Sequence, residues 1–242
     1  MRSFSASDML TLFDQGARLH AIDRALLVLR YALPEVDYES LVSLPLGQRD
    51  RYLLEVRQRN FGDRLDAFTE CPACRERLEF ALSCRALMDN TRSEASAAQQ
   101  IVIEGMQFEL RCPDSTDAAV AAASSSADRA VDAFLTRCLR RADDRHFTVG
   151  ELTVAHRMTI AAELAARDPA AEILLALTCS MCGHGWQALF DINHVLWREI
   201  RARARRLLQE VDVLARVYHW NEAEILGMSE ARRALYVEMA LS

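Results

Sequence analysis

Apolar residues recur three or four positions apart through the first sixty residues of the chain. This spacing predicts amphipathic helices in the segments DMLTLFDQGARL, AIDRALLVLRYAL and LPLGQRDRYLLEVRQRNFG. Ser7 is a candidate N-cap of the first helix, Pro34 ends the second, and the third ends near Gly62. The pattern therefore predicts an N-terminal helical region over residues 1–63.

From Arg64 onward the pattern changes to an alternation of apolar and polar residues, which is typical of half-buried strands. The alternation covers RLDAFTE, RLEFALS and IVIEGMQFELR, and Gly105 divides the last of these as a tight hairpin turn requires. The polar linker DNTRSEASAAQQ is expected to form a loop or a weak helix. Alternation resumes much later, in AEILLALT and GWQALFDI. These segments predict a β region over residues 64–112 and 170–192.

Helical spacing returns between the two halves of this β region. STDAAVAAASSSADRAVDAFLTRCLRRADD predicts two short helices with candidate N-caps at Ser115 and Ser126. GELTVAHRMTIAAELAARD predicts a further helix that stops before Pro169. Strand-like sequence on both sides of these helices indicates an insertion into a small sheet. We therefore expect residues 113–169 to form a helical insertion.

The pattern after Asn193 is helical to the end of the chain, which predicts a C-terminal helical region over residues 193–242. The segment HVLWREIRARARRLLQEVDVLARVY carries a heptad seam that suits packing along a partner helix. Asn221 and Glu224 predict a capping box for the next short helix, and SEARRALYVEMAL predicts the last one. The seam consists of Trp197, Ile200, Ala204, Leu207, Val211, Leu214 and Tyr218.

Composition is that of a folded protein, and the elements above make it a mainly helical α+β one. The 242 residues are 51% hydrophobic and include only 8 Gly and 5 Pro, so disorder is not expected. A net charge of -6 argues against a generally nucleic-acid-binding surface. The sequence has neither the apolar core of a signal peptide nor a charge-free stretch of membrane-spanning length, so we expect a cytoplasmic protein.

Seven cysteines in a chain without a secretion signal favour metal binding, redox chemistry or packing over a disulfide framework. Four of them form two Cys-x-x-Cys pairs, CPAC and CSMC, and a strand-like run follows each pair. Such turns present two thiolates at a separation that suits zinc, and two of them joined to strands are the halves of a zinc ribbon. The sequence therefore predicts a small antiparallel zinc-ribbon-like sheet, and the proposed ligands of its zinc ion are Cys71, Cys74, Cys179 and Cys182.

The two pairs are 104 residues apart, far more than in an ordinary ribbon, and the helical insertion accounts for this distance. A closed four-cysteine site has no open coordination position, so the predicted zinc is structural rather than catalytic. Two alternatives remain open, because the pairs could also be buried packing thiols or a redox dithiol. The redox alternative is the weaker, since each pair precedes a strand and not a helix that would lower a thiol pKa.

The other chemistry-bearing residues predict no catalytic site. His184 could replace a thiolate as a ligand, but it fits better as a residue of the knuckle turn. Asp143 and Asp144 beside His146 lie in a polar connector, where we expect solvated side chains rather than an acid–base cluster. The remaining cysteines are expected to pack in the interior, and these are Cys84, Cys112 and Cys138.

A run of arginines on the predicted C-terminal helix has three interpretations. It could be the solvated flank of a packing helix, a docking surface for an acidic protein, or a nucleic-acid contact. The last interpretation would make the chain a zinc-ribbon nucleic-acid-binding or transcription-associated protein, which needs an aromatic sheet face. Phe80, Trp186 and Phe190 are the candidates, at positions that look largely inward. The arginines are Arg198, Arg201, Arg203, Arg205 and Arg206.

Four segments together resemble a phage baseplate protein family. They are HAIDRALLVLRYALPEVDYESLVSLPLGQRDRYLLEVRQRNFG, CPAC, CSMCGHGWQALFDINHVLWREI and ARRLLQEVDVLARVYHWNEAEIL. The family is similar to the baseplate hub assembly chaperone of T-even phages, and its members occur in phages and in phage-like contractile injection particles encoded by bacteria. The resemblance covers residues 8–240 and is clearest in LPLGQRD, in the two knuckles and in the helix pair at Trp220.

The resemblance implies a non-enzymatic role as a baseplate component or as an assembly chaperone that holds hub or wedge proteins. Association of helices with grooves is the mode of binding that we expect for such a scaffold. Ser180 departs from the pattern, because a proline is expected at this position of the second knuckle. The zinc prediction rests on the cysteine spacing alone and not on the resemblance.

Overall fold

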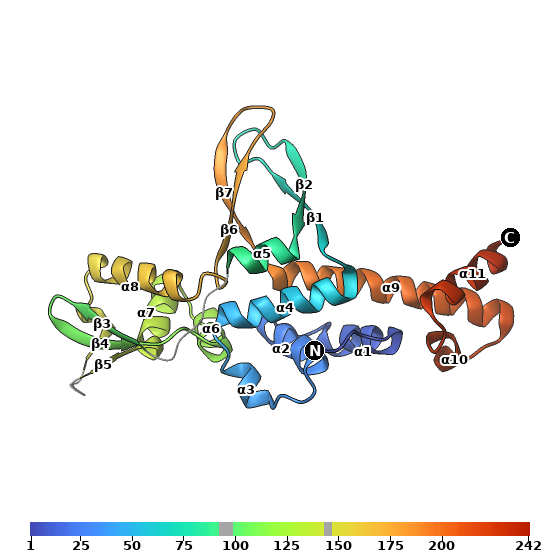
Figure 1. Cartoon of the computed structure of the whole chain (residues 1–242), viewed down its shortest axis with the longest axis horizontal. Coiled ribbons are helices and arrows are strands. Elements are labelled where there is room, and N and C mark those ends of the chain that lie inside the picture. Colours follow the sequence, from blue (N-terminus) through green and yellow to red (C-terminus); the bar gives the residue numbers. More distant parts are fainter. Residues whose placement is uncertain (92–98, 143–146) are drawn as a thin grey trace. The chain divides into compact units, whose positions relative to one another are not determined.

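The structure is a computed structural model, and it describes residues 1–91, 99–142 and 147–242 (Figure 1). The chain forms two compact units, Met1–Glu35 with Asn193–Ser242, and Val36–Ile192. Helices predominate, and the described strands form small antiparallel sheets. The predicted α+β class is therefore confirmed.

The unit that contains both chain ends is helical. It consists of α1 (Ala6–Gly16), α2 (Ala21–Ala32), α9 (Ile192–Tyr218, whose first residue belongs to the other unit), α10 (Glu222–Leu226) and α11 (Glu230–Leu241). The N-cap predicted at Ser7 was wrong, because Ser5 caps α1. The Ser5 hydroxyl accepts from the Asp8 N–H at 3.1 Å and the Asp8 carboxylate accepts from the Ser5 N–H at 2.8 Å, a reciprocal pair that Ser7 cannot form. The capping box predicted at Asn221 and Glu224 is confirmed.

The heptad seam of α9 is used inside this chain. Most of the seven predicted positions are buried, and the other two, Val211 and Tyr218, are half-buried. The Trp197 ring fills the space beside Gly16, where an added Cβ would lie only 2.4 Å from the ring. The Arg24 guanidinium covers the same ring at 4.8 Å from its centroid. The seam that suited a partner helix is thus covered by the chain itself.

The other unit carries two β-hairpins on a helical base. The first hairpin pairs β1 (Arg64–Glu70) with β2 (Arg77–Ser83), and the second pairs β6 (Ile173–Thr178) with β7 (Gly185–Phe190). Both sheets are antiparallel and two-stranded, so the predicted ribbon consists of two separate hairpins. The helices of the base are α3 (Tyr38–Val42), α4 (Leu46–Phe61) and α5 (Cys84–Asn90).

The sequence between the two hairpins forms a layer that consists of a three-stranded sheet and helices. Its strands are β3 (Gln99–Ile103), β4 (Met106–Leu110) and β5 (Leu139–Arg141), in that order. Its helices are α6 (Ser115–Ala122), α7 (Ala127–Cys138) and α8 (Val154–Arg167), with the short 3-10 helix η1 (Val149–Glu151) before α8.

Two details of the predicted insertion were wrong. Residues 139–141 were expected to continue a helix, but they form β5, because the buried Leu139 pairs with Leu110 on β4 and gains sheet hydrogen bonds there. Asp114 caps α6 in place of Ser115, since its carboxylate accepts from the Asp117 N–H at 3.0 Å. The cap predicted at Ser126 is confirmed.

One hydrophobic cluster joins this sheet to its helices. The cluster takes residues from both sides of the boundary predicted between residues 112 and 113, and Phe108 at its centre meets Phe147 edge to face at 5.0 Å. The division of the chain into a β region and a helical insertion otherwise stays a prediction. The cluster consists of Ile101, Ile103, Phe108, Leu110, Leu135, Cys138, Leu139, Val149, Leu152 and Ile160.

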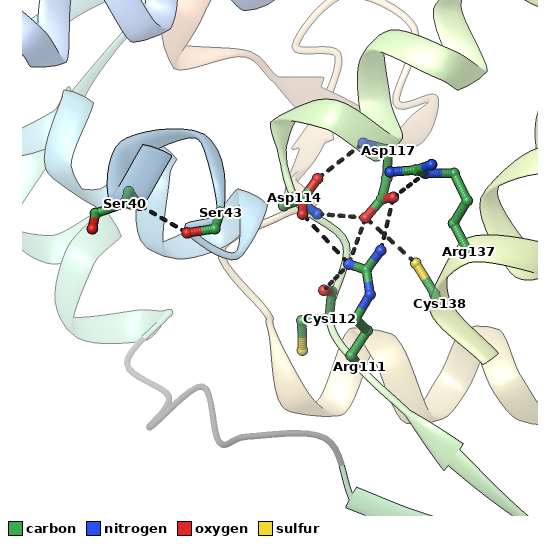
Figure 2. Close-up of polar contacts among 8 residues, drawn as sticks. All are labelled: Ser40, Ser43, Arg111, Cys112, Asp114, Asp117, Arg137 and Cys138. Atoms are coloured by element: carbon green, nitrogen blue, oxygen red, sulfur yellow. Dashed lines mark hydrogen bonds and ion pairs between the residues drawn. The ribbon is translucent and has the colours of Figure 1, made fainter. Parts of the chain in front are cut away.

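A buried carboxylate fastens α6 to this layer (Figure 2). Asp117 has a fully buried side chain, and the Arg111 guanidinium donates to both of its oxygens at 2.6 and 2.9 Å. Arg137 on α7 donates to the same carboxylate, so two charges oppose its own. Burial favours the neutral acid, but these hydrogen bonds and the Asp114 amide outweigh it and lower the pKa of Asp117 to about 2.

Helix α4 is held at both ends, and this positions the first hairpin. Its N-cap residue, Pro45, provides no side-chain cap, and instead the Gly47 N–H donates to the buried Asp168 carboxylate at 2.8 Å. Asp168 lies between α8 and β6, in the segment that leads into the second hairpin. At the other end of α4, Arg57 donates to the Gly62 carbonyl at 2.6 Å, just before β1. A single helix therefore links the lead-in segments of both hairpins.

Candidate metal centre

The loops of the two hairpins bring the four predicted cysteines together. Their four Sγ atoms all lie within 4.8 Å of one another, and they belong to Cys71, Cys74, Cys179 and Cys182. Figure 1 shows the two hairpins projecting together, with β1–β2 and β6–β7 side by side. Elsewhere in the described ranges, no second group of three or more Cys, His, Asp or Glu gathers in this way.

The spacing of the sulfurs matches a tetrahedral thiolate site. Zinc–sulfur bonds of about 2.3 Å place the corners of a tetrahedron about 3.8 Å apart. The Cys71 and Cys182 sulfurs lie 3.7 Å apart, and the Cys74 and Cys179 sulfurs 3.6 Å apart. A disulfide requires about 2.05 Å, so all seven cysteines are free thiols in this structure. The donor set and its dimensions therefore fit a zinc ion.

Both knuckles have the same backbone. The first knuckle, residues 71–76, is closed by hydrogen bonds from the Cys71 N–H to the Glu76 carbonyl and from the Arg75 N–H to the Cys71 carbonyl. The second knuckle, residues 179–184, repeats both bonds, from Cys179 to His184 and from Gly183 to Cys179. All four bonds measure 2.8–2.9 Å. Two sequences with little in common between their cysteines thus fold to one geometry.

The residue after the second cysteine of each knuckle adopts a left-handed conformation. Gly183 has φ of 71° and Arg75 has φ of 61°. Glycine takes this conformation without steric conflict, whereas a side chain such as that of arginine is strained in it. The first knuckle therefore maintains its shape against a local preference of its own sequence.

The hairpins hold the knuckles through alternating strands. Leu65, Ile173 and Phe190 are buried at the ends of the strands away from the knuckles. Phe80 and Trp186 are half-buried on the faces that carry these residues. Isolated two-stranded hairpins are marginally stable in water, so a crosslink between the two loops adds stability that the strands alone lack.

The cluster shifts the pKa values of Cys71 and Cys74 in opposite directions. Desolvation opposes ionisation of Cys71, but the amides of Cys74 and Ala73 and the neighbouring thiols outweigh it and lower its pKa to about 7. The Glu76 amide favours the Cys74 thiolate, yet the adjacent sulfurs and desolvation raise its pKa to about 12. Hydrogen bonds among the neighbouring sulfurs account for the opposite directions of these two pKa shifts, and a bound dication would deprotonate the thiols.

We compared the chain with known protein families, curated proteins and solved structures. None of them matches. The structure shows a mainly helical α+β fold in which four cysteines are positioned to hold a metal ion.

The other predicted residues lie outside this cluster or beyond the described ranges. His184 contributes its carbonyl to the knuckle, and its ring stacks near Trp186 with the centroids 6.1 Å apart. Cys84 and Cys138 are buried and Cys112 is half-buried, as expected of packing cysteines. The connector with Asp143, Asp144 and His146 lies outside the residues that the structure describes.

The arginine run of α9 is engaged at least in part with neighbouring carboxylates. Arg203 pairs with Glu230 at 2.6 Å, and Arg206 pairs with Glu210 at 3.1 Å. Glu210 also accepts from the buried Arg233 at 3.0 Å, which joins α9 to α11.

Among the helices of the described residues, none combines the length and the apolar character that crossing a bilayer needs.

Sequence reasoning found the four cysteines but missed how they pair across the loops. The Cys-x-x-Cys spacing identifies two thiols of one knuckle, whereas the close sulfur contacts join one knuckle to the other. The equal loop length gave a usable signal, because six residues separate the paired strand ends in both hairpins. Two equal loops predict two equal halves of one site.

Proposed function

We propose that this chain is a non-enzymatic, zinc-stabilised scaffold protein that acts as a baseplate component or a baseplate hub assembly chaperone of a contractile injection system. Its partners are then hub or wedge proteins of such a particle. The convergence of four thiols from two hairpins carries the zinc part of the proposal. The resemblance of the LPLGQRD stretch, the two knuckles and the Trp220 region to a baseplate family carries the rest.

The zinc is structural in this proposal. Four cysteines fill a tetrahedral coordination shell, which leaves no position for a substrate or an activated water. The ion crosslinks two hairpins that are far apart in sequence, and the free energy of binding adds to the stability of that arrangement.

Exposed apolar pairs on two helices support a role in protein binding. Val154 and Met158 on α8 are 75% and 68% exposed, and they lie four residues apart on one face. Leu235 and Met239 on α11 repeat this arrangement, at 62% and 64% exposed. Contiguous exposed apolar side chains are typical of surfaces that bind other proteins.

A hollow between α6, α7 and α8 supports the same conclusion. It has a volume of about 320 Å³ and is lined by Val131, Phe134, Leu135 and Leu164, with alanines of α6, α7 and α8 around them. Arg157 is its charged lining residue, and its guanidinium is paired with Asp132 at 2.7 Å. A hollow of this kind suits an apolar side chain of a partner helix.

Co-expression with the hub and wedge proteins of a contractile particle tests the proposal. We expect the tagged chain to co-purify with at least one of them and to remain bound through size-exclusion chromatography. The competing nucleic-acid-binding role predicts a salt-sensitive absorbance at 260 nm in the purified chain. That absorbance, together with the failure of every baseplate protein to bind, would reverse the proposal in favour of a zinc-ribbon nucleic-acid-binding protein.

A further inference from the structure

The four cysteines differ in their access to solvent. Cys71 and Cys179, the first residue of each knuckle, are only 1% exposed. Cys74 and Cys182, the second cysteine of each knuckle, are exposed. A small oxidant in solution therefore has easier access to the second cysteine of each knuckle than to the first.

The sulfur of each exposed cysteine lies against the sulfur of a buried cysteine in the opposite knuckle. Cys182 is 3.7 Å from Cys71, and Cys74 is 3.6 Å from Cys179. An exposed thiol with a second thiol beside it is the arrangement of redox-sensing cysteines, in which the second thiol resolves the oxidised first one. This arrangement occurs twice in one cluster.

We propose that the cysteine cluster is a redox-sensitive crosslink, which a peroxide-class oxidant converts into two disulfides between the hairpins, Cys71–Cys182 and Cys74–Cys179, with release of the zinc ion. The inference rests on the proposed zinc site and adds its regulation.

The reaction balances with two equivalents of peroxide. The thiolate of Cys182 or Cys74, deprotonated in the zinc-loaded chain, attacks a peroxide oxygen. The O–O bond breaks, hydroxide departs, and the sulfur becomes a sulfenic acid. The buried thiolate of the opposite knuckle then attacks that sulfur, the S–O bond breaks, and a second hydroxide leaves a disulfide. Formation of each disulfide transfers two electrons from two thiolates to one peroxide, so four thiolates reduce two peroxides. No thiolate then remains to hold the zinc ion.

The pairing decides what oxidation does to the fold. Disulfides within a knuckle would leave the hairpins without a crosslink once the zinc is released. Disulfides between Cys71 and Cys182 and between Cys74 and Cys179 join the same two loops that the zinc joined. The proposal thus predicts an oxidised protein that has lost its metal but retains the association of its hairpins.

The test treats the zinc-loaded chain with hydrogen peroxide. We follow metal release with a chromogenic zinc chelator and map disulfides by mass spectrometry after trypsin digestion without reduction. We expect about one zinc released per chain and the peptide with Cys71 and Cys74 joined to the peptide with Cys179 and Cys182. Disulfides confined to either knuckle leave the peptides separate and would overturn the proposal, as would retention of zinc under oxidation.

A single substitution resolves the pairing. In Cys182→Ser, we expect one disulfide, and fragmentation of the joined peptides should place it between Cys74 and Cys179. A disulfide of Cys71 with either Cys74 or Cys179 contradicts the proposal. Cys112→Ser is the matched control and should behave as the unsubstituted chain does. If Cys182→Ser does not fold, fragmentation of the joined peptides from the unsubstituted chain, with cleavage between the two cysteines of a knuckle, assigns the pairs.

Failure of the zinc site and failure of this inference are separable. Zinc content before oxidation reports on the metal alone. If no zinc is present, the zinc proposal fails, and the disulfide map of the same protein still decides which sulfurs pair.

Discussion

At the scale of single residues, the two knuckles contain a mismatch between sequence and backbone. Gly183 and Arg75 occupy equivalent positions with positive φ, and glycine is suited to that conformation. Replacing Arg75 by glycine should therefore raise the free energy of unfolding of the zinc-loaded protein, by about 1 kcal/mol. Urea denaturation measures this change.

Gly183→Ala is the matched substitution at the equivalent position. We expect it to lower the free energy of unfolding by about 1 kcal/mol, because alanine is strained at positive φ. If Arg75→Gly also lowers stability, the two knuckles are not equivalent.

Asp117 gives a prediction in pH. Its pKa is lowered to about 2 in the folded chain, against about 3.9 in an unfolded one, so the stability it contributes is present above pH 4 and lost as the pH falls towards 2. Asp117→Asn should lower the free energy of unfolding by about 2 kcal/mol at pH 7, because charged hydrogen bonds to Arg111 and Arg137 are lost.

The measurement is denaturation at a series of pH values from 7 to 3. The difference between Asp117→Asn and the unsubstituted chain should shrink below pH 4, because the Asp117 carboxylate of the unfolded chain takes up a proton there while that of the folded chain stays ionised. Asp128→Asn, at an exposed position of α7, is the control and should show little change at any pH. A difference that stays constant down to pH 3 would mean that the ion cluster does not produce it.

At the scale of elements, we expect the stability of the two hairpins to depend on the cysteine cluster more than that of the three-stranded β3–β4–β5 sheet does. Cys71→Ser should speed amide hydrogen exchange in β1–β2 and β6–β7 by about tenfold or more, because two-stranded hairpins are marginal alone. Amides of β3, β4 and β5 should keep their protection, since the cluster around Phe108 supports them. Cys112→Ser, outside the cysteine cluster, should change neither group. Equal loss of protection in both groups would indicate general unfolding instead.

The local sequence pattern predicts most elements. The remaining elements depend on contacts between residues that are far apart in the sequence. The bounds of β1 and β2 match the alternating runs RLDAFTE and RLEFALS, because one face of each strand is buried and the other is not. Residues 139–141 continue a helical pattern locally, and pairing with β4 changes them into a strand. The Asp168 contact with Gly47 spans 121 residues, and no local pattern could reveal it.

At the scale of the whole molecule, the proposed scaffold role requires that the exposed apolar faces of α8 and α11 bind partners. Leu235→Glu on α11 and Met158→Glu on α8 should each weaken binding to a baseplate partner by about tenfold, because each places a charge in an apolar contact. Thermal unfolding should change little, since both side chains are largely exposed. Ala202→Glu, which adds the same charge at an exposed position of α9, is the control. Unchanged binding in both variants would place the partner on another surface.

The cysteine cluster follows in part from the sequence and in part from the folded chain. Cysteine spacing identified the four cysteines that cluster, because two thiols in a short turn have a defined separation. The cross-knuckle contacts of 3.6 and 3.7 Å depend on how the hairpins approach each other, which only the folded chain reveals.

The central claim is that the four cysteines hold one structural zinc ion, and elemental analysis of the purified chain tests it most directly. Plasma mass spectrometry should find about one zinc per chain, and removal of the zinc by a chelator should lower the midpoint of unfolding. A chain without bound metal, whose unfolding a chelator leaves unchanged, would contradict the account and leave the cysteines as packing or redox thiols.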